Sequence, residues 1–163
     1  MQIINAKIYT MCDDLIIENG YIKYNNGLIS GVGDMNECVK NQDDIDAKGG
    51  WLFPGFIDAH SHLGMWEDSI DFEGDDGNEQ TNPSMPHLRA IDAVNPMDKC
   101  FSEARNAGIT TVITGPGSAN PIGGILIAMK TCGRRVDDML VRDPVGIKFA
   151  LGENPKRAYN EKG

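Results

Sequence analysis

The most informative segment of the sequence is residues 51–64, WLFPGFIDAHSHLG. Up to its two histidines it is almost continuously apolar, which is typical of a strand buried on both faces of a parallel sheet. Residues two apart in a strand point to the same side, so His60 and His62 would direct both imidazoles at one point. That spacing suits two ligands of one metal ion, although a bare His-x-His pair is also typical of two hydrogen-bonded histidines at a strand end. Imidazole binds zinc, iron, nickel and manganese alike, so the pair leaves the metal open.

Short strands joined by tight turns precede this segment. We expect strands over residues 3–9, 15–18, 21–24 and 28–32. Asn19-Gly20 and Asn26-Gly27 each offer the pair of positive φ angles that a two-residue hairpin turn requires. Residues 1–52 therefore predict a small antiparallel sheet, and the polar residues 43–50 lead from it into a second domain, residues 53–163.

The hydrophobic period changes to that of helices after the two histidines. Residues 96–107 carry apolar side chains at helical spacing, and Gly108 follows as a C-terminal cap. The β-branched residues 109–114 predict a strand directly afterwards. We expect a second helix over residues 124–132 and a third strand over residues 145–151. A helix, a short turn and a strand make half of a βαβ unit, so the expected fold class is α/β.

Composition and charge exclude several other classes of protein. Hydrophobic residues make up 40% of the chain and charged residues 24%, as in ordinary globular proteins. The net charge of −9 argues against a nucleic-acid or anionic-membrane surface and leaves divalent metals as plausible partners. The sequence shows no apolar run of about 20 residues and no signal-peptide pattern, so we expect a cytoplasmic protein. We expect reduced thiols, because no CxxC pair occurs among Cys12, Cys38, Cys100 and Cys132.

Two further motifs fail on their spacing. Gly115-x-Gly117 after a strand is similar to a dinucleotide fingerprint, but Asn120 and Pro121 stand where a third glycine and a helix start are needed. The acidic residues 67–77 are similar to a calcium loop, but the spacing lacks its central glycine and final glutamate. We expect a solvated loop there, near the mouth of the site.

The order of these features resembles the start of proteins of the amidohydrolase superfamily, and most of all the imidazolonepropionase-like branch. A hairpin-rich sheet, an acidic crossing and the motif PGFIDAHSHL at residues 54–63 carry the resemblance, which covers essentially the whole chain. It implies a metal-bearing (β/α)8 TIM barrel whose first strand ends in His-x-His, flanked by a small β-sandwich built from both chain termini. Such a barrel takes about 250 residues. We therefore expect this chain to be the N-terminal part of a longer protein, with its first three β/α units, and to be inactive alone.

The same resemblance implies roles for particular residues. His60 and His62 would be metal ligands from the first barrel strand. Some members of the superfamily use a glutamate at the end of the third strand, and Glu153 is the further ligand we predict. Others use a carboxylated lysine, and Lys148 is the alternative. The two have opposite parity along an ideal strand, so both reach the metal only if Gly152 breaks it.

Substrate contacts are expected from the loops at the same face of the barrel. The resemblance implies that His87 and Arg89, in a loop-rich segment, meet a carboxylate or an amide oxygen of the substrate. A lone loop histidine is nevertheless more often solvated.

The activity implied is hydrolysis of a C–N bond in an amide, lactam or cyclic amidine by a metal-activated water, with one or two divalent ions, zinc first. We expect a small-molecule substrate, no nucleic-acid or membrane partner, and a homo-oligomer once the missing C-terminal part or a second chain completes the barrel. The later-strand histidines and final-strand aspartate of the family have no counterpart among the three histidines and three expected barrel strands of this sequence. One alternative is a non-catalytic metal-binding or assembly module that a partner chain completes. A nucleotide-binding βαβ module is weakened by the broken glycine pattern.

Overall fold

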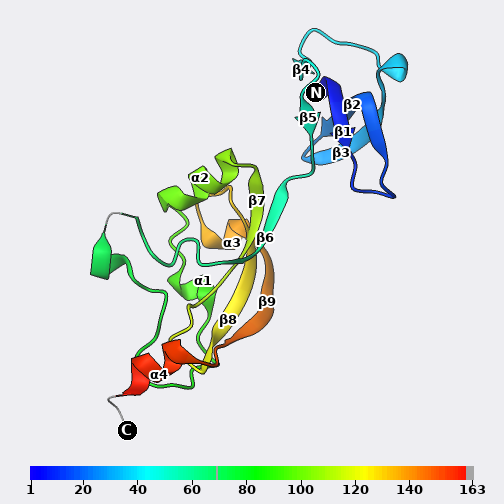
Figure 1. Ribbon diagram of the computed structural model, residues 1–163. Helices are drawn as coiled ribbons and strands as arrows, with labels where there is room; N and C mark the ends of the chain where they lie inside the picture. Colours follow the sequence, from blue (N-terminus) through cyan, green and yellow to red (C-terminus); the bar gives the residue numbers. More distant parts are fainter. Residues whose placement is uncertain (69, 161–163) are drawn as a thin grey trace. The chain divides into compact units, whose positions relative to one another are not determined.

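The computed structural model describes residues 1–68 and 70–160, and it divides into two compact units, Met1–Pro54 and Gly55–Gly163 (Figure 1). The division falls two residues after the expected domain boundary at residue 52. Ser69, in the acidic loop of residues 67–77, lies outside the described residues. Within the described part of the chain, none of the helices has the length and apolar character to cross a membrane.

The first unit is a five-stranded sheet. Its strands are β1 (Gln2–Tyr9), β2 (Ile16–Asn25), β3 (Leu28–Asp34), β4 (Ile45–Asp46) and β5 (Trp51–Leu52), and a short 3-10 helix, η1 (Met35–Glu37), follows β3. The strand order is β3-β2-β1-β4, and β5 also pairs with β1. The three long strands are antiparallel, as predicted, whereas β4 and β5 run parallel to β1.

One of the two predicted hairpin turns is confirmed. Asn26 and Gly27 have φ angles of 50° and 77°, and the flanking residues Asn25 and Leu28 pair across the turn. Both central residues thus occupy the left-handed region that a tight hairpin requires.

The other predicted turn, Asn19-Gly20, is wrong, because β2 runs straight through it. Gly20 pairs with Ala6 of β1 on one side and with Asp34 of β3 on the other. A Cβ atom at position 20 would lie 2.7 Å from Cδ1 of Ile8. The glycine therefore serves close packing in the centre of the sheet instead of a turn.

The second unit contains a four-stranded mixed sheet. Its strands are β6 (Phe56–Ser61), β7 (Ile109–Thr114), β8 (Ile122–Lys130) and β9 (Leu140–Phe149), in the order β6-β7-β8-β9. β6 and β7 are parallel, and β8 is antiparallel to both of its neighbours. The helices are η2 (Asp71–Gly74), α1 (Ala90–Ala93), α2 (Lys99–Asn106), α3 (Val136–Met139) and α4 (Glu153–Tyr159). The α/β class and the strand over residues 109–114 are confirmed.

The helix predicted over residues 124–132 is wrong, since β8 occupies that segment. Its sequence, IGGILIAMK, is a nearly continuous apolar run that fits a buried helix as well as a strand. The segment is a strand because it pairs with β7 on one side and with β9 on the other. Its side chains Ile127 and Met129 are buried on the same face. The third expected strand accordingly begins at Leu140, not at residue 145.

The helix predicted over residues 96–107 is confirmed as α2, although it is shorter at its start. Asp98 caps it, with a side-chain oxygen that accepts a hydrogen bond of 3.2 Å from the backbone N–H of Cys100. Gly108, two residues past its end, has a φ of 89°, which suits the predicted C-terminal glycine.

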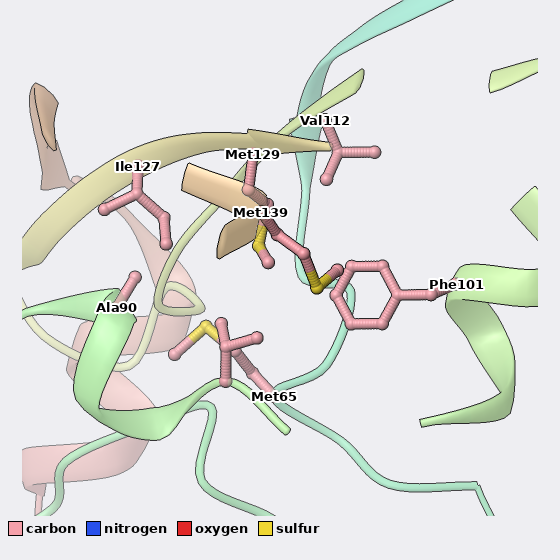
Figure 2. Close-up of a cluster of buried hydrophobic side chains, with 8 residues drawn as sticks. Met65, Ala90, Phe101, Val112, Ile127, Met129 and Met139 are labelled. Atoms are coloured by element: carbon pink, nitrogen blue, oxygen red, sulfur yellow. The ribbon is translucent and has the colours of Figure 1, made fainter. Parts of the chain in front are cut away.

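The core of the second unit lies between the sheet and its helices (Figure 2). Helices α1 and α3 pack on β8, and α2 packs on β7. The buried cluster comprises Met65, Ala90, Val94, Phe101, Val112, Ile127, Met129 and Met139. The cluster includes Val112 of β7 and Met65, which follows the two histidines at the end of β6.

Candidate active site

The imidazole of His62 is held by the chain that follows the neighbouring strand. His62 comes directly after β6, and its Nδ1 lies 2.7 Å from the carbonyl oxygen of Gly115, directly after β7. A carbonyl can only accept a hydrogen bond, so Nδ1 carries the proton and Nε2 keeps its lone pair. Histidines that bind metal are commonly oriented by such a hydrogen bond from their other ring nitrogen.

The two imidazoles lie beside one another, as their spacing predicts. The ring centroids of His60 and His62 are 5.3 Å apart with planes at 75°. His62 also contacts the ring of Trp66 edge-on, with centroids 5.0 Å apart. His62 is half-buried and His60 is exposed, so one ring is fixed by packing while the other faces outward.

A lysine from the far edge of the sheet meets this pair. Nζ of Lys148, on β9, lies 3.2 Å from Nε2 of His60. A lysine ammonium is a donor only, so Nε2 of His60 is the acceptor and its lone pair points at the lysine. The structure therefore brings together His60, His62 and Lys148.

Glu153, the predicted third ligand, borders a pocket that Lys148 also borders. It is the first residue of α4, and its Oε1 lies 3.1 Å from Nζ of Lys156 in an exposed ion pair. Gly152, with a φ of 134°, separates α4 from β9. Across residues 1–68 and 70–160, no group of three or more His, Cys, Asp or Glu side chains could hold a metal ion. The groups that the structure brings into contact are thus two imidazoles and one lysine ammonium.

The predicted substrate residues lie in a segment alongside β8. Isolated bridges join Ser84 to Ile122 and Arg89 to Ile125. Arg89 donates two hydrogen bonds, of 2.9 and 2.7 Å, to the carboxylate of Asp92. These bonds hold the pKa of the Asp92 carboxyl below its usual range, while desolvation opposes them. His87 is exposed.

Arg89 also borders a pocket of about 230 Å³ in the second unit. The same pocket is bordered by the acidic residues Asp76, Glu79 and Asp92, and by Gly123. A Cβ at Gly123 would lie 3.2 Å from Cβ of Lys148, so this wall of the pocket backs onto the lysine. The pocket thus combines one cation with several carboxylates close to the candidate site.

Sequence reasoning missed the role of Gly115. The sequence pattern assigns Gly115 and Gly117 only to a dinucleotide fingerprint that fails on its spacing. The structure shows that the Gly115 carbonyl approaches His62, and that a Cβ at position 115 would overlap Cδ2 of Leu126. The sequence does show a glycine directly after a strand of β-branched residues. Such a glycine indicates that another group approaches the backbone closely, but it does not identify that group.

Comparison with known proteins places this arrangement in a family. No family model matches the chain. It is 31% identical over 157 residues to the amidohydrolase tasK of Hapsidospora irregularis, an alignment that covers 88% of this chain and 16% of that protein. It is 41% identical over 64 residues to an adenine deaminase of Clostridium botulinum, covering 39% of this chain and 11% of that enzyme.

A solved structure agrees over nearly the whole chain. The crystal structure of an amidohydrolase from Thermotoga maritima matches with a TM-score of 0.89 and 39% sequence identity, covering 99% of this chain and 41% of that one. The chain therefore spans well under half the length of each of these relatives. Shared sequence and shared fold together show that this chain belongs to the amidohydrolase superfamily.

Proposed function

We propose that the protein containing this chain is a metal-dependent hydrolase that cleaves a C–N bond in an amide, a lactam or a cyclic amidine. The observation that carries the proposal is the convergence of His60, His62 and Lys148 from the two edges of one sheet. Relatives named amidohydrolase and adenine deaminase support a substrate of this kind. The imidazolonepropionase-like branch stays a prediction within that superfamily.

The residues present fit a divalent metal ion, with zinc as the first candidate. The Gly115 carbonyl leaves Nε2 of His62 unprotonated, and Nε2 of His60 accepts from Lys148, so both nitrogens have the lone pair that a ligand needs. We propose Lys148 as the third ligand residue: its ammonium would lose one proton, and the resulting amine would react with carbon dioxide and lose a second proton to form a carbamate on Nζ. Glu153 is kept as the alternative.

A bound divalent ion would lower the pKa of a water ligand from about 15.7 toward about 7 and polarise the carbonyl under attack. The chain's own residues would hold and orient the reactants. Gly115 fixes the His62 ring, and we propose that Arg89 binds a carboxylate or amide oxygen of the substrate at the neighbouring pocket. His87, on the same segment, stays a predicted contact.

We further propose that β6, β7 and β9, which run in the same direction, belong to a (β/α)8 barrel and that the first unit forms part of a β-sandwich. The antiparallel strand β8, which lies between β7 and β9, departs from the all-parallel pattern of such a barrel and from the three successive β/α units expected from the sequence. Membership of the amidohydrolase superfamily supports this proposal, because the resemblance implies such a barrel and sandwich. Apolar side chains at the two edge strands, such as Ile57 (68% exposed) and Phe149 (62% exposed), suit contact with further strands and helices. These would come from the same chain or from a second one, and self-association stays a prediction.

Metal analysis of histidine variants tests the proposed function. In the complete protein that contains this chain, His60→Ala and His62→Ala should abolish stoichiometric metal and the hydrolysis of a panel of small amides and lactams. His87→Ala is the matched control, because it removes the third histidine and should leave bound metal in place. Metal and turnover that survive in both His60→Ala and His62→Ala would overturn the proposal. Metal binding without turnover in the wild type would instead favour a non-catalytic module.

A further inference from the structure

The hydroxyl of Thr114 is fully buried at the end of β7, next to the candidate site. Thr114 has 0% of its surface exposed, and its Oγ1 donates a hydrogen bond of 2.9 Å to the carbonyl oxygen of Leu63. Leu63 directly follows His62, and 51 residues separate it from Thr114. A buried hydroxyl is costly unless it is hydrogen-bonded, so this contact is a defined part of the packing.

Three consecutive residues around His62 are held by three consecutive residues at the end of β7. Oγ of Ser61 donates to the carbonyl of Ile113 at 3.3 Å, and Nδ1 of His62 meets the carbonyl of Gly115 at 2.7 Å. The Thr114–Leu63 bond lies between these two in sequence on β7. Because β6 ends at Ser61, its backbone hydrogen bonds to β7 do not extend to Leu63. The side-chain bond from Thr114 holds the Leu63 carbonyl instead.

Strand structure alone does not require a hydroxyl at this position. Valine has nearly the same shape as threonine and at least as strong a preference for strands, and Val112 occupies an equally buried position on β7. The hydroxyl is distinctive only in what it bonds, which is the carbonyl of Leu63, the residue directly after His62.

We propose that Thr114 is a positioning residue for His62. Its hydroxyl holds the Leu63 carbonyl, and thereby the backbone from which Nδ1 of His62 reaches Gly115. This arrangement would leave Nε2 of His62 available to the proposed metal ion. The inference rests on the proposed function for the role of Nε2, whereas the tautomer of His62 can be measured without metal.

The test compares Thr114→Val and Thr114→Ser with a matched control, Thr131→Val. Thr131 is equally buried, at 1% exposure, and its Oγ1 donates a 2.9 Å hydrogen bond to the carbonyl of Ile109, at the opposite end of β7. Thr131 directly follows β8, so Thr131→Val removes a hydroxyl-to-carbonyl bond that reaches β7 at Ile109, away from His62. Any effect of lost packing or buried polarity alone should appear in both valine variants.

Two readouts are used on the full chain, with zinc as the probe. In the metal-free protein, ¹⁵N shifts of labelled histidine should show His62 protonated at Nδ1 in the wild type, Thr114→Ser and Thr131→Val, but a mixture of tautomers in Thr114→Val. Zinc affinity should fall about tenfold or more in Thr114→Val and be restored in Thr114→Ser.

An unchanged His62 tautomer in folded Thr114→Val would overturn the positioning role, and so would an equal change in Thr131→Val. If Thr114→Val does not fold, Thr114→Cys takes its place, because its thiol is a weaker hydrogen-bond donor than a hydroxyl. The His62 tautomer and the zinc affinity are then compared between Thr114→Cys and Thr114→Ser. A wild-type protein that binds no zinc would overturn the metal site, while the nitrogen shifts would still decide the role of Thr114.

Discussion

The side-chain nitrogen of Lys148 lies 3.2 Å from Nε2 of His60, although 88 residues separate the two in the sequence. They belong to β9 and β6, the two edge strands of a four-stranded sheet, so the contact depends on how that sheet brings its edges over one face. Glu153, only five positions from Lys148, is paired with Lys156 on α4. The two candidates for the third ligand border one pocket but have different partners, so they can be tested separately.

Lys148→Met should lower zinc affinity and amide hydrolysis by at least about tenfold, because it removes the group that meets His60. Glu153→Gln should leave both near the wild-type values, since it breaks only an exposed ion pair, and such pairs contribute little. Lys130→Met, on the adjacent strand β8, controls for loss of a lysine. Zinc titration and turnover would measure these effects, and loss of zinc in Glu153→Gln alone would reverse the assignment.

Cys100 should resist alkylation in the folded protein. Burial, with the neighbouring Asp98 carboxylate adding to it, raises the pKa of the Cys100 thiol to about 12. A raised pKa favours the thiol over the reactive thiolate, which at pH 8 is then about one part in ten thousand. Exposed Cys12 and Cys132 should react with iodoacetamide first, as followed by mass spectrometry of peptides. Equal labelling of Cys100 and Cys132 at pH 8 would contradict this.

Gly20→Ala should destabilise the first unit by about 1–3 kcal/mol, as expected for overpacking. Its Cβ would lie 2.7 Å from Cδ1 of Ile8 and 2.8 Å from Cγ2 of Ile17. Gly31→Ala is a matched control on β3, where the nearest atom would be 3.8 Å away. Urea unfolding should separate the two variants, and equal midpoints would show that β2 accommodates a side chain at position 20.

Arg89→Met should raise KM for an anionic amide substrate with little change in kcat, because it removes uniform binding at the pocket. Asp92→Asn breaks the same ion pair but keeps the cation, so it should not raise KM. The pKa of Asp92 is lowered by Arg89, which means that the pair persists through neutral pH and is lost only as pH falls through the lowered value. Asp92 is therefore ionised at neutral pH, where steady-state kinetics are measured. An unchanged KM in Arg89→Met would exclude the contact between Arg89 and the substrate.

Features that depend on neighbours in the sequence were predictable. The two-residue period placed His60 and His62 side by side at a strand end, and Asn26-Gly27 indicated its own turn. Helix α2 followed from apolar spacing and from Gly108. In each case the information lies within one turn or one strand, where local backbone preferences decide the conformation.

Features that depend on distant partners were not predictable. Residues 124–132 satisfy a helix and a strand equally well, and β8 exists because β7 and β9 supply its hydrogen bonds. Gly20 was misassigned because its reason is the approach of Ile8. The meeting of Lys148 with His60, and of Gly115 with His62, likewise requires strands that are far apart in the chain to share one sheet. Local preference sets which conformations a segment can adopt, whereas hydrogen bonding and packing between segments select one of them and so assemble the site.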